Sequence, residues 1–297
     1  MSKVLIAGGS GLIGRRLTEM LRQAGYEVNW LSRHASKSGD IQKFSWNVNQ
    51  KTLDPDSLNG VDVIVNLAGA SIDGKRWSSD YKKEIYDSRI NSNLTIFKAL
   101  RDGNHKLSHF ISSSAIGYYG FENRHEILVE TSSPGTDYLA KTCVDWESSA
   151  QQVSELGLPV SIVRTGVVFS KNSQAYEKIV KPIKMGLGAV LGNGNQAFPW
   201  ISLDDISKVY LSLIQNKIES GIYNGVAPQM VNNKELMHIL ASHFGKKIWL
   251  PNVPPFALKL LFGEMANTLL GGSPISPTKL LESHFNFEYP TIEKILK

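Results

Sequence analysis

The sequence is poor in cysteine, and Cys143 is the only one among 297 residues. A single cysteine excludes an internal disulfide framework and a metal site built from several cysteines, and it fits a reducing compartment. The seven histidines are scattered, and none forms an i, i+4 pair around an acidic residue as zinc-binding helices require. We therefore expect a protein without disulfides and without a metal site.

Long hydrophobic runs are also missing. No stretch approaches the roughly 20 apolar residues that span a bilayer. The pattern already enters a strand at Lys3, before a signal peptide would fit. The interpretation is a cytoplasmic protein with no membrane partner.

Charge of one sign is not concentrated anywhere. The formal net charge is +5, but lysines and arginines are dispersed and usually neighbour acids, as Lys82 and Lys83 neighbour Glu84. Nucleic-acid binding needs basic residues clustered on one face, so we expect no nucleic-acid partner. A small positive excess instead favours solubility or an anionic small ligand such as a phosphorylated cofactor.

The most informative pattern that is present lies at the start of the chain. The apolar run Lys3–Ala7 predicts a buried parallel strand, and the amphipathic spacing after the glycines predicts a helix packed on it. Between them, Gly8 would permit a tight turn, Gly11 would let the backbone approach a pyrophosphate, and Gly14 would allow close helix packing. The alternative is a strand-to-helix turn without a ligand. The cofactor contacts predicted here are Gly8, Ser10, Gly11, Leu12, Ile13 and Gly14.

The end of the second strand bears on the type of cofactor. Glu27–Leu31 reads as this strand, and Ser32 and Arg33 follow it. An acid at this place would hold the adenine-ribose diol, whereas a cation accommodates a 2′-phosphate. We therefore predict that Ser32 and Arg33 contact NADP(H), with NAD(H) and an exposed loop arginine as the alternative.

Strand and helix patterns alternate through the first half of the chain. Further strands are expected at 44–46, 61–67, 109–113 and 159–163, and helices at 79–100, 203–214 and 233–244. This order predicts an α/β fold with a Rossmann-type doubly wound parallel sheet. Ser202 and Asn232 are the expected caps of the two later helices. We assign residues 1–170, with 200–226 returning, to an NAD(P)-binding domain, and 171–199 and 227–297 to a smaller C-terminal substrate lobe.

Several motifs together resemble one known family. They are the G-x-x-G-x-x-G turn and the segments 66–69, 76–77, 88–90, 117–119, 146–147, 164–168, 192–194, 198–201 and 224–228. The chain resembles the extended, epimerase-like short-chain dehydrogenases/reductases, and within them the atypical epimerase family 39U with its C-terminal domain of unknown function. The resemblance implies an NADP(H)-binding oxidoreductase or epimerase that acts on a small carbonyl, hydroxyl or nucleotide-sugar-like substrate. It also implies pairing of two copies through the helices that contain Arg89 and Trp146.

The resemblance further implies roles for individual residues. Ser114 would orient the substrate oxygen, while a strand that merely ends in serines is the alternative. Arg89 would lie near the cofactor, or it is a surface cation on its helix. The other implied cofactor contacts are Leu67, Ala68, Gly69, Ser112, Ser113, Arg164, Thr165, Gly166 and Val167.

The usual catalytic motif of this superfamily is not intact. It places a lysine four residues after a tyrosine, so that the ammonium lowers the pKa of the phenol. Here Tyr138 and Lys141 are three residues apart. If the helix is instead aligned with the family on residues 146–147, the positions of the tyrosine and the lysine fall on Leu139 and Cys143. A Tyr138/Lys141 catalytic pair and a helix without catalytic groups both stay open. The second reading favours an NADP(H)-binding sensor or interaction protein over an enzyme.

Overall fold

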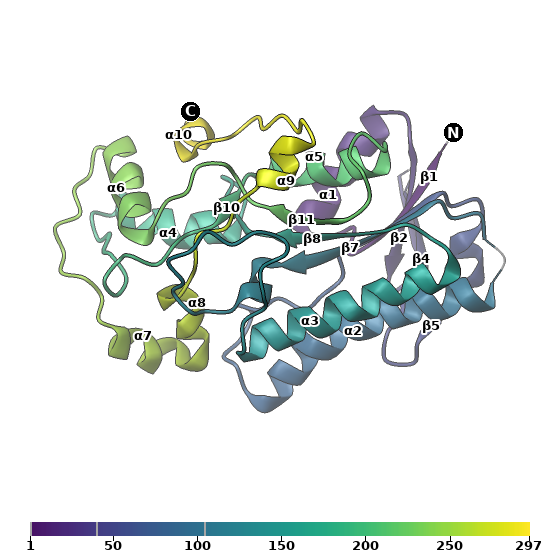
Figure 1. The fold of residues 1–297 in the computed structure, drawn as a ribbon, viewed down its shortest axis with the longest axis horizontal. Coiled ribbons are helices and arrows are strands. Elements are labelled where there is room, and N and C mark those ends of the chain that lie inside the picture. Colours follow the sequence, from purple (N-terminus) through teal and green to yellow (C-terminus); the bar gives the residue numbers. More distant parts are fainter. Residues whose placement is uncertain (1, 40, 104) are drawn as a thin grey trace.

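The computed structural model describes residues 2–39, 41–103 and 105–297, and Figure 1 shows their arrangement. The strands are β1 (Lys3–Ala7), β2 (Glu27–Ser32), β3 (Ser36–Ser38), β4 (Ile41–Asn47), β5 (Thr52–Leu53), β6 (Val63–Asn66), β7 (His109–Ala115), β8 (Val160–Thr165), β9 (Val167–Val168), β10 (Trp200–Ile201) and β11 (Ile222–Gly225). The α-helices are α1 (Leu12–Gln23), α2 (Ser79–Asp102), α3 (Tyr138–Gln151), α4 (Gln174–Lys184), α5 (Leu203–Ile214), α6 (Asn233–His243), α7 (Pro255–Phe262), α8 (Asn267–Leu270), α9 (Thr278–Glu282) and α10 (Ile292–Leu296). Short 3-10 helices are η1 (Pro55–Leu58), η2 (Ile116–Tyr119), η3 (Gln152–Leu156) and η4 (Gly263–Ala266).

A mainly parallel sheet forms the centre of the molecule. Its strand order is β11-β8-β7-β6-β1-β2-β4-β3, and every pair from β11 to β4 is parallel. The chain runs outward from β1 in one direction and then outward from β6 in the other. The predicted Rossmann-type fold is thus confirmed, with the order reversing beside the glycine turn that follows β1.

The edge beyond β2 differs from the prediction. Residues 44–46 were expected as a short strand, but β4 covers Ile41–Asn47 and pairs with two antiparallel strands, β3 and β5. A turn at Gly39 lies between β3 and β4, and a turn at 48–51 lies between β4 and β5. A hairpin leaves a weaker periodic signal than a buried parallel strand.

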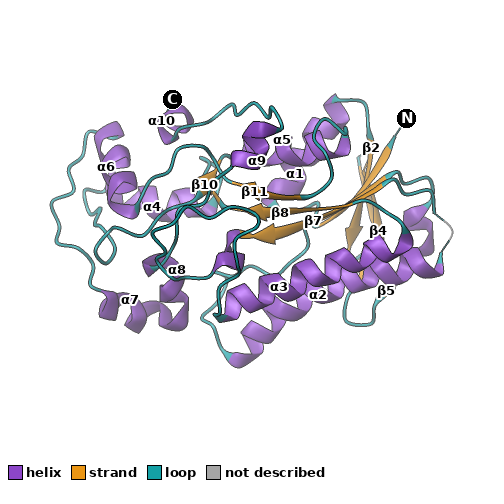
Figure 2. Ribbon diagram, in the orientation of Figure 1, coloured by secondary structure: helices purple, strands orange, loops and turns teal. Residues whose placement is uncertain are grey.

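Helices cover both faces of the sheet, as Figure 2 shows in purple. Side chains alternate along β1, so that Val4 and Ile6 face α1 and α5, whereas Leu5 and Ala7 belong to the core under α2 and α3. All four side chains are fully buried. The near-continuous apolar runs of the central strands follow from this two-sided burial.

Two helix starts agree with the expected caps. The Ser202 side chain accepts a hydrogen bond from Asp205 N at the start of α5. Asn232 and Glu235 form a reciprocal capping box at the start of α6. Within the described residues, no helix combines the length and apolar character needed to cross a membrane.

A second hydrophobic core lies away from the sheet, at the left in Figure 1. It joins α4, α6 and α10 to Phe169 and Trp200, both fully buried. Trp200 therefore packs in a core instead of lining an open surface. The C-terminal segment divides between the two cores, because Phe285 and Phe287 pack with α1 and α5 while α10 packs against α6.

Candidate cofactor and active site

The turn after β1 has the shape that its glycines suggest. Gly8 has φ +80°, and a Cβ there would lie 2.8 Å from the carbonyl carbon of Leu67. A Cβ on Gly14 would overlap the Gly8 carbonyl oxygen. Gly11 precedes α1 without a side-chain cap, and no acid occupies the first helical turn. The first amides of α1 are consequently free to bind an anion.

Arginines flank this turn on the side of β2. Ala7 pairs with Leu31, so the ends of β1 and β2 lie next to each other and Arg33 follows directly. Arg33 is exposed, and Arg15 is held by a 2.7 Å hydrogen bond from its Nε to the Ser10 carbonyl. Ser10, Gly11 and Leu12 are themselves exposed. Three of the predicted contacts thus form an accessible surface near two arginines, whereas Gly14 is buried.

Side chains alternate along β7, so Ser112 and Ser114 face α2 and α3 while Ser113 faces the other side of the sheet. Ser114 was expected just after the strand, but β7 extends to Ala115. Its side chain is 2% exposed and donates a 2.6 Å hydrogen bond to Glu147 Oε1 on α3. Ser112 is fully buried, and Ser113 is the partly exposed member of the three.

Arg164 lies beside Ser114 in the sheet and is committed to a buried ion pair. Its Nε and Nη2 donate to the two carboxylate oxygens of Glu147, each at 2.8 Å. Nη1 donates to the Tyr119 hydroxyl and the Glu130 carbonyl. Burial alone would lower the pKa of Arg164, but hydrogen bonds and the charge of Glu147 outweigh it and raise this pKa. The side chain thus holds β8, α3 and η2 together.

The residues that follow Arg164 are placed by backbone contacts. Thr165 is partly buried, and Gly166 N donates to the Gly225 carbonyl. A Cβ on Gly166 would lie 3.0 Å from the Pro199 carbonyl oxygen, so the chain passes close to this segment. Val167 begins β9, which pairs with β10.

The structure does not bring Tyr138 and Lys141 together. The Tyr138 hydroxyl donates a 2.6 Å hydrogen bond to the Lys82 carbonyl on α2, and its ring packs edge-on against Trp77. Burial is the main reason why its pKa is raised. The Lys141 side chain is exposed. Tyr138 therefore contributes to the packing of α3 against α2.

Leu139 and Cys143 occupy the side of α3 that faces η2. A Cβ on Gly117 would lie 3.6 Å from Leu139 Cβ and 3.5 Å from Cys143 Sγ. Burial raises the pKa of the Cys143 thiol to about 12, so it is neutral at physiological pH. Neither side chain transfers protons near neutral pH.

Arg89 reaches from α2 to the loop after β6. Its Nη1 donates to the carbonyls of Ala70 (3.0 Å) and Ile85 (2.9 Å). The guanidinium carbon lies 5.0 Å from the centroid of the Trp146 ring and 3.3 Å from where a Cβ of Gly69 would be. The exposed Gly69 and the partly buried Leu67 and Ala68 thus share one edge with Arg89.

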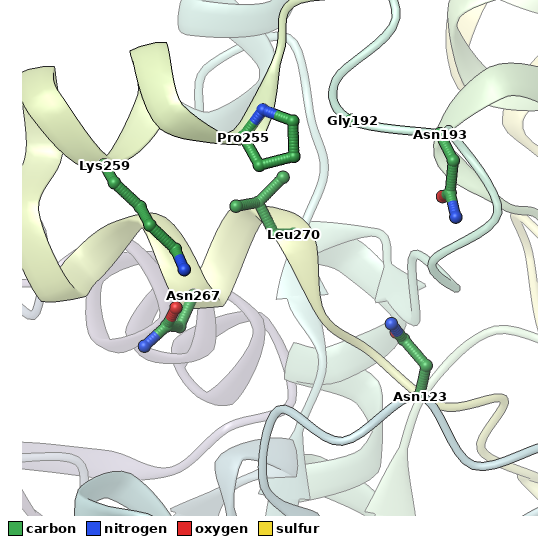
Figure 3. A pocket seen from close by; sticks show the side chains of 7 residues that line it. All are labelled: Asn123, Gly192, Asn193, Pro255, Lys259, Asn267 and Leu270. Atoms are coloured by element: carbon green, nitrogen blue, oxygen red, sulfur yellow. The ribbon is translucent and has the colours of Figure 1, made fainter.

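A pocket of about 280 Å³ is lined by α7, α8, the segment 192–193 and the loop after η2. Figure 3 shows its lining: Asn123, Gly192, Asn193, Pro255, Lys259, Asn267 and Leu270. The Oδ1 atoms of Asn123 and Asn193 accept backbone hydrogen bonds from Gly272 and Asn195, which leaves their amide nitrogens as donors. Sequence reasoning missed this pocket, because its residues come from four distant segments.

Other missed residues are Glu147 and Tyr119, which hold Arg164. The sequence signal for Glu147 was its place in the 146–147 motif. That motif served only to align the helix with the family pattern, and it did not indicate the contact with Arg164. Among the described residues, no group of three or more His, Cys, Asp or Glu side chains could hold a metal ion.

The parallel sheet with its order reversal, the glycine turn at a helix start and the adjoining lobe define a dinucleotide-binding α/β protein of the Rossmann class. A family model described as "NAD dependent epimerase/dehydratase family" matches residues 4–224, and one described as "Domain of unknown function (DUF1731)" matches residues 253–297. The chain belongs to the NAD-dependent epimerase/dehydratase family, in its epimerase family 39U, as the motifs indicated.

Relatives match over nearly the whole chain. "Epimerase family protein Mb2239" of Mycobacterium bovis is 35% identical over 99% of this chain and 96% of its own length. The crystal structure of human epimerase family protein SDR39U1 (isoform 2) with NADPH superimposes with a TM-score of 0.86 at 27% identity, covering 99% of this chain and 98% of that one. The nucleoside-diphosphate sugar epimerase from Corynebacterium glutamicum gives a TM-score of 0.81 at 29% identity, covering 99% and 57%.

Proposed function

We propose that this protein is an NADP(H)-dependent oxidoreductase or epimerase. The observation that carries the proposal is the turn at Gly8–Gly14, where any side chain on Gly8 or Gly14 would collide with backbone and the first amides of α1 are open. This shape fits a pyrophosphate. A bound nicotinamide supplies or accepts hydride.

The preference for NADP(H) rests on charge. Arg33 is exposed at the end of β2, and Arg15 stands close to the same turn. Two guanidinium groups favour a 2′-phosphate, and no acid of the first α1 turn opposes them. The human relative was crystallised with NADPH, which supports the same choice.

The remaining cofactor contacts are proposed along the carboxyl ends of β6, β7 and β8. They are Leu67, Ala68, Gly69, Arg89, Ser112, Ser113, Arg164, Thr165, Gly166 and Val167. Gly69 is the exposed member of this set, whereas Arg164 would act through the backbone because its side chain is paired with Glu147.

For the reaction we propose that Ser114 orients the reacting oxygen of a carbonyl or hydroxyl substrate. The hydroxyl of Ser114 donates to Glu147, so its oxygen can accept a hydrogen bond from a substrate hydroxyl, whereas a substrate carbonyl would need that hydrogen to turn from Glu147 toward it. We place the rest of the substrate in the pocket of the C-terminal lobe, assigned to residues 171–199 and 227–297. Lys259 and the amide donors of that pocket suit a substrate with anionic and hydroxyl groups, such as a nucleotide sugar.

A second candidate function is an NADP(H)-binding sensor that does not turn over substrate. The observation that favours it is the position of Tyr138, whose hydroxyl is bound to the Lys82 carbonyl while Lys141 is exposed. A chain without the usual proton donor can still bind the cofactor.

One experiment separates the two. Purified protein is titrated with NADPH and NADH by fluorescence and is then mixed with a panel of aldehydes, ketones and UDP-sugars. We expect tighter binding of NADPH, turnover of at least one substrate, and a rate about 10- to 100-fold lower for Ser114→Ala with unchanged NADPH affinity. Binding without turnover would favour the sensor, and failure to bind either nucleotide would refute the proposed function.

A further inference from the structure

Arg89 is a largely buried cation whose hydrogen-bonding capacity is only partly used. A guanidinium has five N–H donors. Nη1 uses both of its donors on the carbonyls of Ala70 and Ile85. Nε and Nη2 form no hydrogen bond with the described residues, which leaves three donors without a partner.

The charge of Arg89 is also not balanced by an acid. Within the described chain it forms no ion pair, and the groups whose charges act on it are Cys143, Tyr138 and Tyr81. Burial raises the pKa of Cys143 to about 12 and also raises the pKa of Tyr138, so neither carries a charge that balances Arg89 at physiological pH. Burial lowers the pKa of Arg89, as expected for a cation with little compensation.

The guanidinium is nevertheless held in one place. The guanidinium carbon lies 5.0 Å from the centroid of the Trp146 ring. It also packs closely on Gly69, because a Cβ added to Gly69 would lie only 3.3 Å from that carbon. Gly69 is exposed. A fixed cation with unused donors at an open loop is arranged to bind an anionic or oxygen-rich ligand.

We propose that Arg89 binds the nicotinamide-side half of the cofactor, through its ribose hydroxyls and adjoining phosphate oxygens. The inference rests on the proposed function. In the superfamily pattern, the lysine would stand on α3 at the place of Cys143. The inference means that the cation instead comes from Arg89 on α2, which lies beside Cys143.

The order of the strands assigns this half of the cofactor. Arg33 follows β2, on one side of the glycine turn, whereas Arg89 contacts the loop after β6, on the other side. A dinucleotide bound across the carboxyl edge has its pyrophosphate at the turn and one nucleoside on each side. If Arg33 meets the adenosine 2′-phosphate, then Arg89 meets the opposite nucleoside.

The test measures by calorimetry the binding of three ligands. NADPH and NADH are complete dinucleotides, whereas adenosine 2′,5′-bisphosphate represents only the adenosine half of NADPH. For Arg89→Gln we expect about 10- to 100-fold weaker binding of both NADPH and NADH, with the affinity for the bisphosphate unchanged. Arg33→Gln should give the converse pattern: weaker binding of NADPH and of the bisphosphate, and unchanged binding of NADH. Arg89→Lys should fall between wild type and Arg89→Gln, because it keeps the charge and loses the planar fork.

Arg101→Gln is the matched control, since Arg101 lies on the same helix, is exposed and pairs with Asp102. It should bind all three ligands as wild type does. Thermal unfolding of each variant checks the fold. Arg89→Gln with wild-type NADPH affinity, or with equal loss for NADPH and the bisphosphate, would overturn the inference. If wild type itself binds no ligand, it is the proposed function that fails.

Discussion

Two arginines reach the carboxyl edge of the sheet, and they differ in what surrounds them. Arg164 is 2% exposed, and Glu147 neutralises it through two hydrogen bonds. Arg89 is also largely buried, yet its nearest charged or titratable groups include no carboxylate. A buried ion pair joins elements of the fold, whereas a buried cation without an acid costs stability and requires another reason to be retained. The comparison separates a structural arginine from one available to a ligand.

The largest effect is expected from removing Arg164, with removal of Arg89 as the comparison. Arg164→Met leaves Glu147 buried without a partner and should lower the free energy of unfolding by about 3–5 kcal/mol. Arg89→Met removes an unbalanced charge and two hydrogen bonds to carbonyls, so it should change that energy by about 1 kcal/mol or less. Urea unfolding of the two variants measures the difference. Equal losses of unfolding free energy would mean that both arginines are structural, which would contradict the distinction between them.

The next prediction concerns Cys143, the group that would neutralise Arg89 if it were a thiolate. Its pKa is raised from 9.0 to about 12, so at pH 7.5 the thiolate is about 1000-fold scarcer than in the unfolded chain. Iodoacetamide should therefore react slowly with native protein and rapidly in urea, as followed by mass spectrometry. Since the folded thiol titrates above the unfolded one, this group favours folding fully below about pH 9 and loses that contribution toward pH 12.

Two results would bear on the pairing of Arg89. Rapid alkylation of the native protein at pH 7.5 would show that Cys143 carries charge and that Arg89 is paired after all. Arg89→Gln should not speed the reaction, because the charge of Arg89 lowers the pKa of Cys143 and its loss raises that pKa further.

The smallest effect sharpens the description of the paired arginine. The Tyr119 hydroxyl accepts from Arg164 Nη1 and lies 2.7 Å from Asn224 Oδ1, so Tyr119→Phe should cost about 1–2 kcal/mol of unfolding free energy. NADPH affinity should stay within about twofold. Tyr118→Phe is the control, since the Tyr118 ring stacks on Arg164 at 3.4 Å while its hydroxyl forms no hydrogen bond with the described residues. A larger loss for Tyr118→Phe would show that the hydroxyl network is unimportant.

The parts of the fold that the sequence predicted are those encoded locally. The Gly8–Gly14 turn, helix 203–214 and the caps at Ser202 and Asn232 all depend on residues within a few positions of each other. The buried parallel strands could be predicted from the sequence because both of their faces are apolar, which gives short continuous apolar runs. The hairpin of β3 and β4 was missed, because its pairing depends on an edge that periodicity does not define.

The candidate site was less predictable because its contacts join distant helices. Arg89 was named from the sequence, but its position over Trp146 depends on how α2 packs on α3. The spacing of Tyr138 and Lys141 could not reveal that the Tyr138 hydroxyl binds a carbonyl on α2. Side-chain partners across such helix contacts follow from tertiary packing, which a residue pattern does not specify.

The division of the C-terminal segment between two cores has a consequence for synthesis on the ribosome. Phe285 and Phe287 complete the packing around α1 and α5, in the same core as β1. The glycine turn belongs to the same layer, so a nascent chain lacks part of the support for it until residue 287 has left the exit tunnel. Folding of the sheet domain is thus completed only after Phe285 and Phe287 have been synthesised.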